Sequence, residues 1–86
     1  MAVSNIYDEK LERVKTLTSA GEAKEALKLC LEAIQIYPHL NKGYFFLSQV
    51  KIALADQNKD KQKKLIHLKS ALQDTLYYFK LSKNNQ

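Results

Sequence analysis

The apolar positions between Gly21 and Pro38 predict one short amphipathic helix. Small or apolar side chains recur there every three or four residues, which places them on one face of a 3.6-residue helix. They are Ala23, Ala26, Leu27, Cys30, Ala33, Ile34 and Tyr37. Gly21 provides the turn before the helix, and Pro38 disfavours helical geometry at the residue before it. We therefore expect the helix to end at or before Tyr37.

A second stripe precedes this helix and predicts another one, which starts after a frayed segment, residues 1–4. Ser4 or Asn5 is suited to cap it, because a short polar side chain accepts hydrogen bonds from the free amides of a helix start. Its apolar face consists of Tyr7, Leu11, Val14 and Leu17 or Thr18. A short turn ends at Gly21, so the two helices are expected to form an antiparallel hairpin, residues 6–37.

Two further stripes predict a second hairpin, residues 41–81, followed by a polar tail, residues 82–86, of which residues 83–86 are expected to be disordered. Asn41 is suited to cap the third helix, and Gly43 in its first turn is expected to cost little. The face of the third helix is Tyr44, Leu47, Val50, Ala53 and Leu54. The fourth helix is expected to bury Leu65, Leu68, Leu72, Leu76 and Phe79, with Ala71 between them.

The composition supports one all-α domain of four helices, residues 1–86. Two glycines and one proline leave few breakers for a sheet of short strands, and the abundant Leu, Lys, Ala, Glu and Gln favour helix. No cationic segment followed by an apolar run comes after Met1, and no long uncharged stretch exists, so neither a secretion signal nor a membrane span is expected. The expected compartment is the cytoplasm, with the nucleus as the alternative.

No arrangement of residues in the sequence is typical of catalysis or metal binding. His39 and His67 lie far apart, and there is no cysteine pair or glycine-rich phosphate loop. Cys30 lies on an apolar face, where a buried thiol acts as a small hydrophobic group. We therefore expect no enzyme, no catalytic or metal site and no cofactor.

The distribution of charge leaves one alternative function open. The net charge is +5, and residues 38–86 hold nine lysines against three acids, whereas residues 1–37 hold five basic residues against six acids. The densest cluster is Lys59, Lys61, Lys63, Lys64, His67 and Lys69. Such a strip fits phosphates or an acidic peptide, and an ordinary solvated helix face explains it equally well.

The spacing of Gly21, Ala26, Ala33 and Pro38 resembles the second half of a tetratricopeptide repeat, a helix-turn-helix unit of about 34 residues. The segment Tyr44-Phe45-Phe46-Leu47-Ser48 then falls where the next repeat's aromatic, leucine and small residues are expected. The resemblance implies two stacked hairpins that act as an adaptor, with a peptide or protein bound on the concave side lined by the first helix of each hairpin.

The resemblance places Asp8, Leu11, Glu12, Lys15, Lys42, Phe45, Phe46 and Gln49 on that concave side. The expected partner-binding residues are Leu11, Lys15, Lys42, Phe45, Phe46 and Gln49, together with Tyr77 and Tyr78 at the far end. Consecutive residues of a helix cannot all face inward, so at least one of Phe45 and Phe46 should be exposed or buried only by a partner. The alternative is that both rings pack between the hairpins. For the same geometric reason at least one ring of Tyr77, Tyr78 and Phe79 should be partly exposed. Either Phe79 packs while the two tyrosines lie over neighbouring surface, or these rings form an end cap or a partner surface.

The sequence thus predicts a protein-interaction module with a peptide or protein partner and no membrane partner. The runner-up is a basic helical domain that binds nucleic acid through phosphates. A third alternative is a small homo-oligomeric structural unit.

Overall fold

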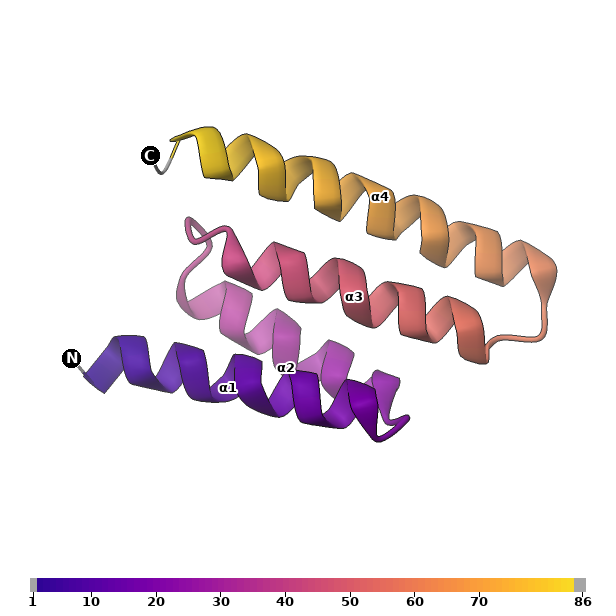
Figure 1. The fold of residues 1–86 in the computed structure, drawn as a ribbon, viewed down its shortest axis with the longest axis horizontal. Helices are drawn as coiled ribbons and strands as arrows, with labels where there is room; N and C mark the ends of the chain where they lie inside the picture. Colours follow the sequence, from indigo (N-terminus) through magenta and orange to yellow (C-terminus); the bar gives the residue numbers. More distant parts are fainter. Residues whose placement is uncertain (1, 85–86) are drawn as a thin grey trace.

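The all-α class is confirmed by the computed structural model, which describes the backbone of residues 2–84 and the side chains of residues 6–83. Within that range the chain forms α1 (Ala2–Ser19), α2 (Ala23–Ile36), α3 (Lys42–Gln57) and α4 (Lys61–Asn84). The ribbon reverses its direction at each connection, so successive helices run in alternate directions along the long axis (Figure 1). This path is compatible with the two predicted hairpins.

The core lies between the first three helices. α3 packs against both α1 and α2, whereas α4 packs against α3 and against no other helix in the described range. The buried side chains that form the core are Tyr7, Leu11, Val14, Ala23, Ala26, Cys30, Ala33, Ile34, Leu47, Val50 and Leu54. The apolar faces predicted for the first three helices are therefore confirmed, and α4 adds little to them.

The predicted helix between Gly21 and Pro38 is confirmed as α2. Gly21 has a φ of +81°, a left-handed conformation that glycine adopts without steric cost, and Tyr37 caps the far end of the helix. Ala26 and Ala33 are fully buried on the face of α2 that meets its neighbours. Their small side chains let the backbones of adjacent helices approach closely.

Both ends of the chain are more helical than the sequence indicated. α1 already begins at Ala2, so the predicted frayed start and the cap at Ser4 or Asn5 are wrong. α4 continues to Asn84, so the predicted disorder is wrong for residues 83–84, while residues 1 and 85–86 lie outside the described range. No proline or glycine occurs in residues 2–19 or 61–84, so nothing interrupts the helices within these ranges.

The predicted inward face of α4 is wrong for all of its large apolar residues. Leu65, Leu68, Leu72, Leu76 and Phe79 are exposed, and only Ala71 of the predicted set is buried. A helix turns by about 100° per residue, so Leu72 points well to one side when Ala71 faces α3. The small Ala71 side chain lets α4 approach α3 closely, and polar contacts on either side of it hold α4 in that rotation.

Those polar contacts join α3 to α4 along their length. Lys51 Nζ lies 2.7 Å from Asp74 Oδ2, with both side chains mostly buried, and it donates a hydrogen bond to Ser70 Oγ at 2.7 Å. The Lys51–Asp74 contact is an ion pair without hydrogen-bond geometry, because Asp74 Oδ2 accepts no hydrogen bond within the described range. Near the other end, Asn41 Nδ2 donates to Ser82 Oγ at 2.7 Å.

Candidate partner-binding surface

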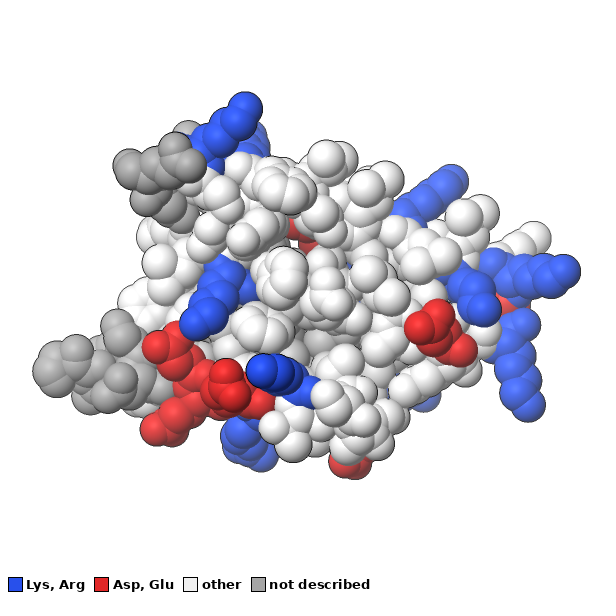
Figure 2. Space-filling view, viewed as in Figure 1, with Lys and Arg blue, Asp and Glu red and all other residues white. Residues whose placement is uncertain are grey.

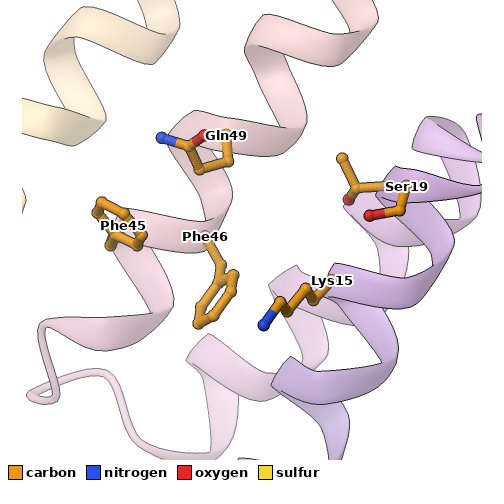
Figure 3. Close-up of a pocket in the computed structure, with 6 residues that line it drawn as sticks. Lys15, Ser19, Phe45, Phe46 and Gln49 are labelled. Carbon is orange, nitrogen blue, oxygen red and sulfur yellow. The ribbon is translucent and has the colours of Figure 1, made fainter.

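A hollow of about 350 Å³ lies between the C-terminal half of α1 and the start of α3. We call it the α1–α3 hollow; its lining residues are Lys15, Thr18, Ser19, Phe45, Phe46 and Gln49. Lys15 and Ser19 are one turn apart on α1, and Phe45 and Gln49 are one turn apart on α3, so helical periodicity brings each pair to the same face. The packing of α3 against α1 then places the two faces opposite each other (Figure 3).

The two phenylalanines of the hollow have different surroundings. The ring of Phe46 extends from α3 toward Lys15 of α1 (Figure 3), and it is partly buried against the core. Phe45 is 44% exposed, and its ring centroid lies 5.8 Å from that of Phe46 in an edge-to-face arrangement. The expectation that at least one of these rings is exposed is therefore confirmed, and the exposed ring is Phe45.

Aromatic contacts continue from the hollow onto α4. The ring of Tyr78 lies 5.5 Å from Phe45, and the ring of Phe79 lies 5.3 Å from Tyr78. Tyr77 packs edge-to-face on Tyr44 at 4.7 Å. The expectation that Phe79 packs is wrong, because Phe79 is the most exposed of the three rings. Both tyrosines lie over the neighbouring α3, as expected.

The structure brings together four of the eight predicted site residues. Lys15, Phe45, Phe46 and Gln49 share the hollow, and they come from the two helices that the resemblance indicated. Tyr78 joins them through its contact with Phe45, whereas Tyr77 contacts Tyr44 instead. Four residues are thus one group, and Tyr78 extends it toward α4.

Two of the predicted site residues lie elsewhere. Leu11 is 1% exposed and belongs to the core, so its side chain does not reach a partner. Lys42 forms an ion pair with Asp8 at 3.5 Å on the exposed surface, outside the hollow. Thr18 and Ser19 were not among the predicted site residues, although both lie about one turn after Lys15 and so on the same side of the helix.

A buried junction of three helices fixes where α3 begins and thereby positions Phe45 and Phe46. The amide of Gly43 donates a hydrogen bond to the Tyr7 hydroxyl at 2.8 Å, and the Cys30 thiol donates to the Gly43 carbonyl at 3.5 Å. The first amides of a helix have no partner inside the helix, so Tyr7 supplies one for α3. Asn41 occupies the predicted cap position, but its side chain makes no capping hydrogen bond.

Gly43 is required at this junction by space rather than by its backbone conformation. A Cβ atom there would lie 2.8 Å from Ile34 Cγ1 and 3.1 Å from the Tyr7 hydroxyl oxygen. Contacts this short force neighbouring groups to move. The expectation that Gly43 costs little was therefore incomplete, because it considered only the helix that contains the glycine.

The Cys30 thiol is a structural group in this core. Burial raises the pKa of Cys30 from 9.0 to about 12, with a smaller contribution in the same direction from Asp74. The thiol consequently keeps its proton at neutral pH and serves as the donor to Gly43. A thiolate is the reactive form of cysteine, so this environment suppresses the reactivity of Cys30.

We expect the free energy of unfolding to fall as the pH rises from about 9 toward 12. The folded state retains the Cys30 proton in this range while the unfolded state releases it, since the pKa of Cys30 is higher in the folded state. Below about pH 9 the protonated thiol makes its full contribution to the free energy of unfolding. Above that pH the contribution of this one group falls by up to about 1.4 kcal/mol per pH unit. Urea titrations at several pH values should show a shallower decline for Cys30→Ala; an identical decline would refute this account.

The lysine cluster of the nucleic-acid alternative lies at the start of α4, away from the α1–α3 hollow. Lys61 and Lys63 are exposed to solvent. Lys59 and His67 line a separate hollow together with Lys24 of the α2 helix. This arrangement gathers positive charge, but nothing in it is specific for a nucleic acid, and that alternative stays a prediction.

The described residues contain neither a metal-binding cluster nor a membrane-spanning helix. Within residues 2–84 no group of three or more His, Cys, Asp or Glu side chains is arranged to hold a metal ion. In the same range no helix combines the length and the apolar character needed to cross a membrane.

Comparisons with known proteins assign no family to the chain or to this surface. No protein-family model, no curated protein and no solved structure matches it significantly.

Proposed function

We propose that this chain is a non-enzymatic protein-interaction module that binds a peptide or protein partner at the α1–α3 hollow. The observation that carries the proposal is Phe45, a large aromatic side chain that is almost half exposed at the edge of a concave surface. Aromatic residues that a partner can bury supply a large share of the binding energy in many interfaces. The polar side chains of Lys15 and Gln49 beside it are suited to fix the orientation of a partner.

The arrangement of the helices supports the same proposal. α3 packs against both helices that precede it, as expected when one helical hairpin stacks on another. The hollow is lined by the first helix of each hairpin, the side on which the tetratricopeptide-repeat resemblance predicts binding. We extend that resemblance to this chain as part of the proposal, with an adaptor role as its consequence.

The chemistry of the hollow indicates what part of a partner would fit. Phe45 and Phe46 offer apolar contact, while the Lys15 ammonium group attracts negative charge. The amide of Gln49 and the hydroxyl of Ser19 can each donate and accept hydrogen bonds. A peptide segment with an apolar side chain next to a carboxylate would satisfy all of these groups.

We expect Phe45→Ala to lose most partner capture while the fold remains intact. The immobilised chain would be incubated with a lysate of the organism that encodes it, and captured proteins would be quantified by mass spectrometry. Capture of the specific partner should fall by roughly tenfold or more, the range of a binding hot spot of about 1.4 kcal/mol or more. Thermal melts should show that the variant still unfolds cooperatively.

Leu31→Ala is the matched control, because Leu31 on α2 is 46% exposed and lies outside the hollow. It should leave capture unchanged. Equal capture by wild type, Phe45→Ala and Leu31→Ala would contradict the proposal, as would capture by none of them.

A further inference from the structure

A long apolar stripe on α4 has no partner within the described chain. We call Leu65, Leu68, Leu72, Leu76 and Phe79 the α4 stripe; all five are exposed. Their spacing of three and four residues aligns them along one side of the helix over about 21 Å. Single exposed leucines are common on protein surfaces, whereas a continuous apolar surface marks an interaction site.

The α4 stripe continues onto α3 to form one surface. Phe45 of α3 contacts Tyr78, which in turn contacts Phe79 at the end of the stripe. Ile52 lies two turns after Phe45 on the same side of α3 and is also exposed. Figure 2 shows a broad uncharged region over α3 and α4, with most charged side chains around its edge. We call the α4 stripe together with Phe45, Ile52 and Tyr78 the α3–α4 surface.

Within this chain, a surface formed by two helices is already covered by a third helix. α3 packs against the neighbouring pair α1 and α2, and it does so with an apolar stripe of Leu47, Val50 and Leu54. The pair α3 and α4 offers an apolar surface of similar kind, and no further helix of the described chain covers it. The geometry therefore favours a helix of about four turns as the occupant.

The charges around the α4 stripe select among such helices. The lysines beside it on α4 are Lys61, Lys64, Lys69, Lys80 and Lys83. Asp74, the acid within α4, is already paired with Lys51, and Asp56 is the exposed acid one turn after Ile52 on α3. A second copy of α4 would bring lysines against lysines, which is repulsive, whereas acidic flanks on the incoming helix would be attracted.

We infer that the α3–α4 surface binds an amphipathic helix of a partner protein, with an apolar stripe facing α4 and acidic residues on its flanks. The inference rests on the proposed function as an interaction module, and it adds the chemical class of the partner and a second binding surface. Phe45 borders both surfaces, so one partner can span them.

The test uses three synthetic, fluorescently labelled peptides of about 18 residues, or five helical turns. The first carries leucines at helical spacing of three and four with glutamates on the flanks. The second replaces the glutamates by lysines, and the third keeps the first composition with the leucines moved out of register. Fluorescence anisotropy should show that the glutamate peptide binds at least tenfold more tightly than either of the others.

Two matched variants of the full chain locate the binding. Leu72→Gln alters the α4 stripe, and Ile66→Gln alters an equally exposed residue on another side of α4. Since both side chains are already exposed, neither change should unfold the chain. Leu72→Gln should weaken binding of the glutamate peptide at least tenfold, and Ile66→Gln should leave it unchanged.

Each other outcome overturns the inference. Equal affinity for the glutamate and lysine peptides would show that charge does not select the partner. A dimer in sedimentation equilibrium that Leu72→Gln dissociates would make a second copy the occupant. Leu72-dependent binding to phosphatidylglycerol vesicles without peptide binding would make it a lipid surface. If no peptide binds while capture still depends on Phe45, this inference fails and the proposed function stands.

Discussion

Leu11→Ala is expected to lower the free energy of unfolding by about 2 to 5 kcal/mol, the usual range for truncating a buried leucine. Leu11 is 1% exposed between the first three helices, so the change removes apolar contacts and leaves a cavity. The same truncation on α4, Leu72→Ala, should change the free energy of unfolding by less than about 0.5 kcal/mol, because Leu72 is 60% exposed. Urea denaturation followed by circular dichroism measures both.

The pair distinguishes the observed packing from the one that periodicity alone suggests. If Leu72→Ala destabilised the chain as much as Leu11→Ala, the α4 stripe would be part of the core. The polar contacts between α3 and α4 would then need a different explanation. A small loss for Leu11→Ala combined with weaker partner capture would instead return Leu11 to the binding surface.

Gly43→Ala is the second change with a large expected effect, a destabilisation of about 1 to 3 kcal/mol from overpacking. Helix propensity alone predicts the opposite sign, since alanine favours a helix interior over glycine by up to about 1 kcal/mol. The added methyl group would lie 2.8 Å from Ile34 Cγ1 in a buried junction, so steric crowding outweighs propensity. Denaturant midpoints give the sign directly.

The neighbouring Lys42→Ala is the control, because Lys42 is exposed in the same helical turn and its ion pair with Asp8 is on the surface. An exposed ion pair contributes little, about 0 to 1 kcal/mol. Stabilisation of the chain by Gly43→Ala would show that the junction of Tyr7, Ile34 and Gly43 is looser than described.

The sequence contained enough information for the first three helices and their common core. Their stripes arise from residues close in the chain, and each stripe was matched by another on a neighbouring helix. α2 was the clearest case, because Gly21 and Pro38 fixed both of its ends. Local periodicity and breakers together determine such elements.

The sequence did not reveal which face of α4 meets α3. A stripe shows where apolar side chains lie, but not whether the rest of the fold covers them. Here the small Ala71 and the Lys51–Asp74 ion pair decide the rotation of α4, and Lys51 and Asp74 lie on different helices. The role of Gly43 could not be predicted either, because its contacts come from Tyr7 and Ile34, which are far away in the sequence.

About half of the residues of the candidate site could be predicted from the sequence pattern. Phe45 and Phe46 had to include one exposed ring, and the resemblance placed Lys15 and Gln49 on the same side. Periodicity placed Leu11 in the core stripe, whereas the resemblance placed it on the partner surface. Of these two predictions, the one from periodicity was correct. Hydrogen bonds and packing that involve three helices, as at Gly43, required the structure.

The most direct test of the account is photo-crosslinking from the α1–α3 hollow. A photoreactive phenylalanine analogue would replace Phe45 in one sample and Leu31 in another, two positions of nearly equal exposure on different helices. After irradiation in lysate, the account predicts a discrete covalent adduct with a partner protein from position 45 and none from position 31. The same adduct from both positions, or an adduct from position 31 alone, would contradict binding at the hollow.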